Sequence, residues 1–452
     1  MDQVHWTRDS GSFPPPVLQP IIDNVIEWYE EQPHTPPVNS VDPNPHFDNV
    51  VLDWNQVALD AIRYYSITDP PEDAGYVSRA LAMQSIAMFD TLRAIEDQPG
   101  FLVTREAPNG IDADAAVTAA AHRILVELFP RYEKALDRAY EAHLDQIKDG
   151  RAEDQGVAFG NRIAEAVIES RSDDGSDPYG YLERVAGDDP GAYRPTPPDF
   201  TEAIQPHWGQ VRPFVLESGD QFRPPPPPAL TSRQYTDDLK EVKAFGDLYS
   251  DVRSPAQTLS ALWWSNDEDT YTRVGQWSDI ADRILDAQDR SPLESAYLLT
   301  ELNVGLADSI IACWDAKFTY DFWRPVTAIR EAGRDGNWAT RPDPDWLPLL
   351  VTTPDHPEYT SGHSILGSTA NQVLTDFFGA IPFTGTTETL PGVYLTFPDF
   401  ETAAVDEAAS RIYAGVHYRV STERGLFMGE QVGGVIVDAF NRFEPNSDGH
   451  LV

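Results

Sequence analysis

The sequence predicts an all-α fold. Apolar residues recur every three or four positions along most of the chain, and no convincing run alternates apolar and polar residues as a half-buried strand does. No internal repeat is visible. With 452 residues, 41% of them hydrophobic, the chain is long enough to bury a large core. We therefore expect a large helical bundle whose helices are joined by proline-rich connectors.

The proline-rich segments suggest how the chain is organised. Residues 1–48 are expected to form a proline-rich arm in which only residues 21–29 suggest a helix. Residues 49–235 are expected to form an N-terminal helical half with a proline-rich strap, and 236–443 a C-terminal helical bundle, followed by a flexible tail at 444–452. Helical spacing of apolar residues predicts helices in both halves. They span residues 50–65, 77–95, 112–129, 132–147, 153–171, 237–247, 255–265, 271–285, 292–318, 364–378, 403–414 and 423–443.

Several elements carry additional signals. The alanine-rich run 77–95 is apolar on more than one face, which is typical of a buried helix. Gly425, Gly429 and Gly433 recur every four residues in the last helix, which favours close packing against a neighbouring helix. The five prolines at 224–228 are interpreted as a rigid strap on the protein's own surface, with recognition by a proline-binding domain as the alternative.

The composition is strongly acidic. Asp and Glu number 73 against 33 Lys and Arg, which gives a formal net charge of −40, and only five of the basic residues are lysine. Such an acidic, lysine-poor composition resembles that of proteins from salt-loving microbes; an ordinary acidic protein is the alternative. The charge argues against nucleic acid and anionic membranes as partners. A site for an anion must therefore oppose the overall field of the protein.

This charge predicts a stability that depends on salt. Repulsion among the excess carboxylates destabilises the compact state in dilute buffer, whereas molar salt screens charges over about 3 Å. We expect the melting temperature to rise from dilute buffer to molar KCl or NaCl, as thermal melts at the two concentrations will show. A melting temperature that does not rise would reject the halophilic interpretation.

The single cysteine, Cys313, excludes an intramolecular disulfide and a cysteine zinc cluster, and its apolar surroundings predict an inert core thiol. The first residues show neither a basic-then-apolar signal pattern nor a twin arginine, and no apolar run reaches 18 residues. We therefore expect a cytoplasmic protein without a membrane span. The oligomeric state, including a homo-oligomer, stays open.

The first of three chemically rich segments offers two cations among aromatic residues. Lys317 and Arg324 lie seven positions apart, which on a helix places them roughly on one face, and Pro325 disfavours helix at Arg324. Arginine presents a planar fork to an oxoanion and lysine a point charge. Alone, such a pair is usually a solvated surface feature, but the neighbouring aromatic residues favour a partly buried pocket.

The second and third segments add a hydroxyl, a glycine, another cation and two imidazoles. Ser361 and Gly362 stand at a predicted helix N-terminus, where free N–H groups favour an anion, and His363 follows on the first turn as a candidate for proton exchange. Arg411 precedes His417, a candidate metal ligand or nucleophile. A helix cap or a core histidine would explain each feature singly. Together they predict a site for a tetrahedral oxoanion.

The order Lys-x6-Arg-Pro, then Ser-Gly-His, then Ser-Arg-x5-His resembles the signature of the vanadium-dependent haloperoxidases and the related phosphatidic acid phosphatase type 2 family. Residues 54–63 and 78–83 also resemble the bacterial haloperoxidase branch, which extends the resemblance over most of the chain. The resemblance implies the helical-bundle architecture of the vanadium haloperoxidases, with vanadate as the cofactor and phosphate or sulfate as other occupants of the site.

The resemblance also implies a role for each motif residue. Vanadate would be held by three cations, a hydroxyl and a backbone N–H, from Lys317, Arg324, Ser361, Gly362 and Arg411. His417 would bind vanadium through a ring nitrogen, and His363 would serve as the acid–base residue. Lys317 and these two histidines are the catalytic candidates.

The implied activity is the oxidation of bromide or iodide by hydrogen peroxide to hypohalous acid, with a small organic acceptor as a further partner. His356 occupies a position that, in the resembling family, tends to be histidine in bromoperoxidases and an apolar aromatic residue in chloroperoxidases. Trp314 matches the tryptophan on the halide side of the pocket. Two alternatives stay open: an acid phosphatase that uses the same pocket through a phosphohistidine intermediate, and a non-catalytic oxoanion-binding protein.

The sequence departs from the family's pattern at two positions. Thr360 replaces the usual proline before Ser-Gly-His, which is expected to matter little. Ser421 stands four residues after His417, where the pattern has an aspartate that would orient the imidazole and raise its basicity. Glu423 is the nearby carboxylate in sequence that is a candidate to substitute.

Overall fold

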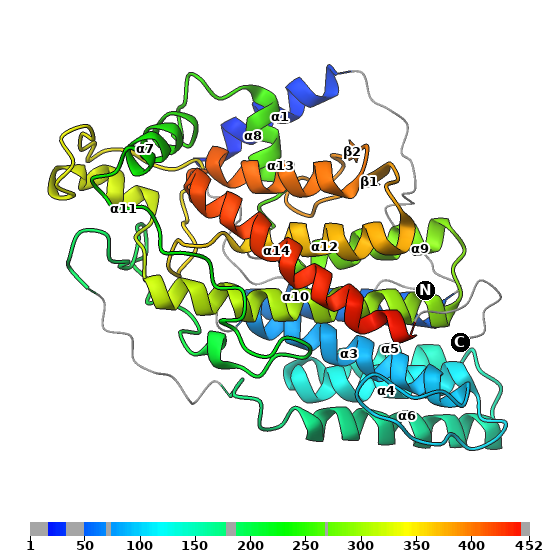
Figure 1. The fold of residues 1–452 in the computed structure, drawn as a ribbon. Helices are drawn as coiled ribbons and strands as arrows, with labels where there is room; N and C mark the ends of the chain where they lie inside the picture. Colours follow the sequence, from blue (N-terminus) through cyan, green and yellow to red (C-terminus); the bar gives the residue numbers. More distant parts are fainter. Residues whose placement is uncertain (1–16, 33–48, 69–73, 178–186, 267–269, 444–452) are drawn as a thin grey trace.

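The computed structural model describes residues 17–32, 49–68, 74–177, 187–266 and 270–443 (Figure 1). This part of the chain is mostly helical, which confirms the all-α prediction. Much of the proline-rich arm and the tail at 444–452 lie outside the described residues.

Each predicted helix corresponds to an observed one. The helices that come first in the chain are α1 (Gln19–Glu30), α2 (Val50–Thr68), α3 (Ala74–Ile95), α4 (Ala113–Leu128), α5 (Glu133–Leu144) and α6 (Arg151–Ser170). The later helices are α7 (Arg233–Phe245), α8 (Pro255–Trp263), α9 (Thr272–Ala287), α10 (Pro292–Tyr320), α11 (Pro325–Arg330), α12 (Gly362–Phe378), α13 (Phe400–Tyr413) and α14 (Arg419–Phe440).

Two kinds of element were not predicted. The short helix α11 follows directly after Arg324, and two three-residue strands, β1 (Phe383–Gly385) and β2 (Leu395–Phe397), pair in antiparallel register. These elements are too short to show a periodic pattern of apolar residues. The helical prediction was therefore right for the long elements and silent on the short ones.

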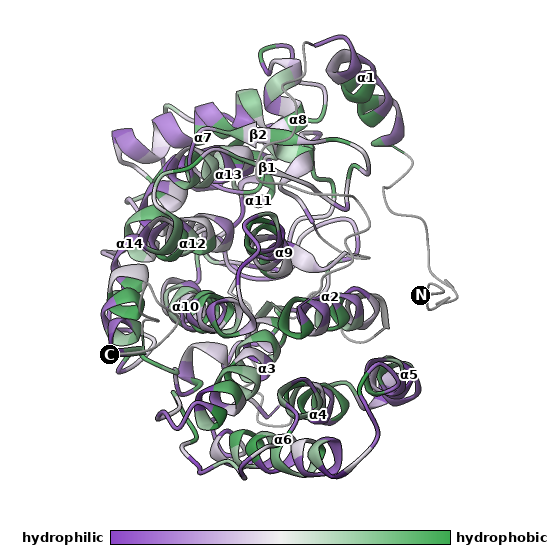
Figure 2. Cartoon of the chain, turned by 90° about the vertical axis from the view of Figure 1, so that its right-hand side faces the viewer, coloured by the Kyte–Doolittle hydropathy of each residue, from purple (hydrophilic) through white to green (hydrophobic). Residues whose placement is uncertain are grey.

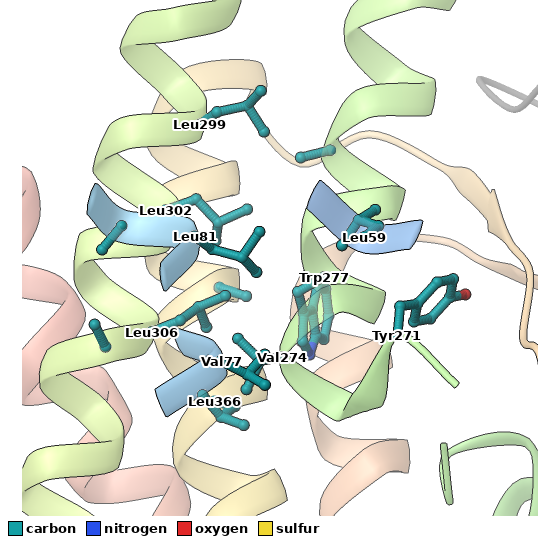
Figure 3. Packing of buried hydrophobic residues seen from close by; sticks show 14 of the residues in the cluster. Leu59, Val77, Leu81, Tyr271, Val274, Trp277, Leu299, Leu302, Leu306 and Leu366 are labelled. Carbon is teal, nitrogen blue, oxygen red and sulfur yellow. The ribbon is translucent and has the colours of Figure 1, made fainter. Parts of the chain in front are cut away.

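The helices stack in successive layers. In Figures 1 and 2, α6 and α4 lie at one side, α3 follows, α10 crosses the middle, and α12 and α13 lie beyond it. Consecutive members of this series pack against one another. Buried side chains fill the space between layers; Figure 3 shows Val77 and Leu81 of α3 near Leu302 and Leu306 of α10. As expected for a buried helix, α3 has buried residues on every face.

Among the described helices, α10 alone is long and apolar enough to cross a membrane by length and composition. Its apolar window is completely buried within the fold, as expected for a core helix. Because α10 contacts α3 on one side and α12 on the other, it links the two stacks of helices. Its last turn carries Lys317, so the most deeply packed helix positions the first candidate site residue.

The glycine repeat of α14 permits close packing, as predicted. A Cβ atom at Gly425 would lie 2.8 Å from the Ser361 carbonyl oxygen, and one at Gly429 would lie 2.4 Å from that of Ile365. At Gly433 the added atom would lie 2.5 Å from a side-chain carbon of α12. Only glycine allows these helix backbones to approach so closely, and the approach fixes the N-terminus of α12.

The prolines at 224–228 form a strap against the protein itself, as the sequence favoured. Tyr359 donates a hydrogen bond of 2.7 Å to the carbonyl of the second proline, and Tyr320 donates to that of the first. Just before the strap, the Arg223 guanidinium pairs with the Asp315 carboxylate of α10 at 2.5 Å. The strap is thus tied to the end of α10 and to the loop before α12, the two segments that carry most of the candidate site.

Candidate active site

The chain brings Lys317 and Arg324 together, but not through one helical face. Helix α10 ends at Tyr320, and Asp321 adopts a left-handed conformation with φ 49°, so the chain turns sharply there. Arg324 lies beyond the turn, as the residue that precedes α11. The expectation that Pro325 keeps Arg324 out of a helix is confirmed, whereas the idea of a shared helical face is wrong.

Both cations converge on the loop that precedes α12. Lys317 Nζ donates to the backbone carbonyls of Pro357 and Glu358, at 2.8 and 3.0 Å. The Arg324 guanidinium donates to carbonyls of the same loop and to the carbonyl of Val416 at 3.0 Å. Both side chains are fully buried. Because carbonyl oxygens carry only partial charge, these contacts hold the cations without neutralising them.

The charge of Lys317 depends on what the site holds. Burial lowers the pKa of its ammonium group to about 7, because the charged form is poorly solvated there. A bound anion favours the charged form and would raise this pKa again. Lys317 therefore gains a proton more readily when the site holds an oxoanion.

Arg324 lies between two imidazoles. Its Nη2 contacts His356 Nδ1 at 2.9 Å, and its Nη1 contacts His417 Nε2 at 3.2 Å. A guanidinium only donates, so His417 Nε2 accepts and His417 carries its proton on Nδ1. His356 Nδ1 also lies 3.2 Å from the Pro357 carbonyl, so its two polar neighbours favour opposite tautomers. Burial, followed by the charges of nearby cations, holds the pKa of both histidines well below the usual value, so both are neutral.

Glu358 supplies a carboxylate that the sequence interpretation missed. Its Oε1 accepts from His417 Nδ1 at 2.8 Å and from the backbone N–H of Tyr418 at 3.0 Å. Burial raises the pKa of Glu358 to about 7. The carboxylate holds His417 with its Nε2 lone pair directed at Arg324, which is the tautomer a metal ligand needs.

The contact between Glu358 and His417 explains why neither Ser421 nor Glu423 orients the imidazole. Ser421 is buried, and its hydroxyl donates to the Glu358 carbonyl at 3.4 Å. Glu423 is exposed and does not replace the missing aspartate. The carboxylate instead comes from a different segment of the chain. The one sequence feature that pointed to Glu358 was its position, three residues before Ser361 of the Ser-Gly-His motif.

The N-terminus of α12 lies at the same site. Ser361 is the N-cap residue, and its hydroxyl accepts from the Ser364 N–H at 3.4 Å, while Gly362 is the first helical residue. A Cβ atom built at Gly362 would meet one atom of the described chain within 4 Å, Cys313 Sγ at 3.9 Å. The glycine therefore borders open space inside a buried site. Free N–H groups and the helix dipole make such a space favourable for an anion.

The remaining motif residues lie around this space. His363 Nε2 contacts the Trp264 carbonyl at 3.0 Å, so this nitrogen carries the proton and Nδ1 holds the lone pair. Burial and then the charge of Arg411 hold the pKa of His363 well below its usual value. Arg411 is fully buried near the end of α13, and its carbonyl accepts from the His417 N–H at 3.3 Å across a turn at Gly415, whose φ is 82°.

Trp314 and His356 form an aromatic pair beside the cations. Their ring centroids lie 4.9 Å apart, and both side chains are almost completely buried. The Trp314 indole belongs to α10, one turn before Lys317, whereas His356 belongs to the loop before α12. The two residues assigned to the halide side from sequence are therefore in contact.

The structure brings all nine candidate residues to the end of α10, the start of α12 and the turn after α13. Two buried arginines, a lysine that an anion would hold in its charged form, a helix N-terminus beside open space and a neutral imidazole with a directed lone pair form a donor set suited to a tetrahedral or five-coordinate oxoanion. These residues therefore fit vanadate. Fold and site together define an all-helical protein with a buried cluster of cations and imidazoles at a helix N-terminus.

Comparisons with known proteins show which proteins the chain resembles. Residues 297–444 match the family model described as the VCPO second helical-bundle domain. The chain is 24% identical over 421 residues to the vanadium chloroperoxidase of Curvularia inaequalis, covering 76% of this chain and 68% of that protein. Residues 297–444 thus match a domain of this family, and the chain as a whole is similar to vanadium-dependent haloperoxidases, which are peroxidases.

Solved structures give the same fold. A bacterial vanadium-dependent iodoperoxidase superposes with a TM-score of 0.75 at 27% identity, covering 88% of this chain and 98% of that one. A holo-type bacterial vanadium-dependent chloroperoxidase superposes with a TM-score of 0.67 at 18% identity, covering 89% and 99%. At that identity the second likeness concerns the fold alone.

Proposed function

We propose that this protein is a vanadate-dependent haloperoxidase that oxidises bromide and iodide with hydrogen peroxide to hypohalous acid. The observation that carries the proposal is the orientation of His417, whose Nε2 lone pair faces a buried cationic site while Glu358 holds Nδ1. Vanadate, when bound, supplies a Lewis acid that activates peroxide toward a halide without any change in its own oxidation state. The similarity to vanadium-dependent proteins supports the cofactor.

The site residues have three roles in the proposed reaction: charge balance, hydrogen bonding to the oxoanion and proton transfer. Lys317, Arg324 and Arg411 balance the charge of the oxoanion, and the N-terminus of α12 donates hydrogen bonds to its oxygens. His363 is neutral with a lone pair on Nδ1, so it accepts a proton from the incoming peroxide and returns it to the departing oxygen.

The proposed function is tested by titrating the apo protein with vanadate in the presence of peroxide and bromide. Halide oxidation that appears with vanadate supports the haloperoxidase. Hydrolysis of phosphate esters that vanadate inhibits would instead identify an acid phosphatase working through a phosphohistidine on His417. Vanadate binding with neither activity would identify a non-catalytic oxoanion-binding protein.

The halide preference is proposed from His356. This imidazole contacts Arg324 through Nδ1 at 2.9 Å and lies beside Trp314, with the two ring planes tilted by 50°. An imidazole beside the reacting peroxide can accept or donate a hydrogen bond and so alter its electrophilicity, whereas a phenyl ring would only exclude water. Chloride is harder to oxidise than bromide or iodide, so it is the first halide that a less activated peroxide fails to oxidise.

We expect turnover of bromide and iodide with little or no turnover of chloride, and a changed halide profile in a His356→Phe variant. The phenyl ring removes the ring nitrogen that Arg324 contacts at 2.9 Å, and with it every hydrogen bond that the imidazole could make to the peroxide. Steady-state assays with each halide at matched ionic strength measure the effect. Chloride turnover that rivals bromide, or a variant with the wild-type profile, would contradict the role of His356.

A further inference from the structure

His363 is held by a backbone carbonyl at the end of α8. The carbonyl of Trp264 accepts from His363 Nε2 at 3.0 Å, and Trp264 is the C-cap residue of α8. The last carbonyls of a helix have no partner within the helix, so this oxygen is free to accept from another segment. The position of the His363 ring therefore depends on where α8 ends.

A carboxylate of α13 fixes that end of α8. Asp406 Oδ2 accepts from Trp264 Nε1 at 2.8 Å and from the Ser260 hydroxyl at 3.0 Å. Ser260 lies one helical turn before Trp264, and its carbonyl accepts from the Trp264 N–H at 3.1 Å. The two helices pack against each other (Figure 1). One carboxylate oxygen thus joins two side chains of the turn whose carbonyl holds His363.

The next residue of α13 holds the indole that stacks on Trp264. The rings of Trp264 and Trp277 have centroids 5.6 Å apart and planes 28° from parallel. Trp277 Nε1 donates to Glu407 Oε2 at 2.9 Å. Glu407 also lies against α12, because a Cβ atom at Gly367, one helical turn after His363, would overlap Glu407 Oε2. Consecutive acidic residues of α13 therefore fix both indoles of the stack.

Stability alone does not explain the carboxyl of Asp406. Burial raises its pKa, and only its hydrogen bonds to Trp264 and Ser260 act in the opposite direction. Both donors are neutral, and no cation pairs with Asp406 in the part of the chain that the structure describes. Desolvating a carboxyl without a cation disfavours folding. What the carboxyl does provide is a fixed direction for two donors of α8.

We propose that Asp406 is a positioning residue for halide oxidation, which acts on His363 through Trp264. By fixing the last turn of α8, it keeps the Trp264 carbonyl on His363 Nε2. The proton then stays on Nε2 and the lone pair on Nδ1, as proton transfer from the peroxide requires. This inference rests on the proposed function and adds a residue outside the three motifs to it.

The test compares Asp406→Ala with Asp406→Asn. Alanine removes both hydrogen bonds, whereas asparagine keeps an oxygen that can accept them. The alanine variant should lose kcat roughly tenfold or more, because a small displacement of a catalytic group slows the reaction. Its vanadate Kd should stay at the wild-type value, and the asparagine variant should stay close to wild type in both. Asp376→Ala is the matched control, because Asp376 is an exposed carboxylate of α12.

A double-mutant cycle separates positioning from a general loss of structure. If Asp406 acts through His363, Asp406→Ala should have little further effect on kcat in a His363→Ala background. An equal loss in both backgrounds would overturn the proposal. If Asp406→Ala does not fold, Trp264→Phe removes the same hydrogen bond from the other side and keeps a ring that can stack. A wild-type kcat in that variant would also overturn the proposal.

Nitrogen NMR of histidine-labelled protein gives a readout that needs neither vanadate nor turnover. It shows which ring nitrogen of His363 carries the proton, and His363→Ala identifies the signal. Wild type should show the proton on Nε2, and Asp406→Ala a mixture of tautomers. Wild type without vanadate-dependent halide oxidation would reject the proposed function and leave this comparison intact. An unchanged His363 signal in Asp406→Ala would reject the positioning role alone.

Discussion

A His417→Ala variant is expected to lose both tight vanadate binding and turnover. His417 is the neutral imidazole whose Nε2 lone pair faces the cationic site, so alanine removes the direct ligand itself. The loss of affinity should exceed the roughly 10- to 100-fold typical of removing an outer hydrogen-bond partner of a metal ligand. Calorimetric titration with vanadate measures binding, and steady-state bromide oxidation measures turnover.

A His363→Ala variant is expected to behave differently. His363 is anchored to the Trp264 carbonyl and has no part in holding vanadium, so most of the binding should survive. Turnover should fall roughly 10²- to 10⁴-fold, the usual contribution of general acid–base catalysis. His122→Gln is a suitable control because His122 lies on α4, where it pairs with Asp137 at 2.9 Å. Equal and small losses of vanadate affinity in both site variants would refute the assigned roles.

The sequence predicted the long helices and the motif residues because both kinds of signal are local. The spacing of apolar residues over ten or more positions shows which face of a helix is buried, and this does not require knowing which helix packs against it. The glycine repeat of α14 likewise needed no knowledge of its partner to predict close packing. Confirmation came from α12, whose backbone carbonyls lie where side chains at Gly425 and Gly429 would have to be.

What the sequence could not predict depends on contacts between distant segments. The prediction that Lys317 and Arg324 share one helical face was wrong, because α10 ends before Asp321, which has a left-handed backbone conformation. The seven-residue spacing of the two cations does not reveal this turn. Glu358 lies 59 positions from His417 in the chain and contacts it only in the fold. In each case the missing information was the path of the backbone between segments.

Glu358 leads to the second large expected effect. A Glu358→Gln variant should bind vanadate roughly 10- to 100-fold more weakly and turn over correspondingly less. The carboxylate accepts from His417 Nδ1 at 2.8 Å and keeps the lone pair on Nε2. A neutral amide brings no negative charge to that contact, so the imidazole becomes a weaker ligand. Vanadate titrations of wild type and variant, at a pH above 7 where the wild-type carboxyl is ionised, measure the difference.

Two control variants distinguish the role of Glu358 from those of the nearby residues Glu423 and Ser421. Glu423→Gln makes the same chemical change at an exposed carboxylate and should leave vanadate affinity unaltered. Ser421→Ala removes a hydroxyl that donates to the Glu358 backbone at 3.4 Å and that also favours the charged form of the Glu358 carboxyl, but it leaves the carboxylate on the imidazole, so its effect should be smaller than that of Glu358→Gln. If Ser421→Ala weakened binding more than Glu358→Gln, the orientation of His417 would depend on the serine. In that case no carboxylate would orient His417, neither at the position of Ser421 nor from Glu358.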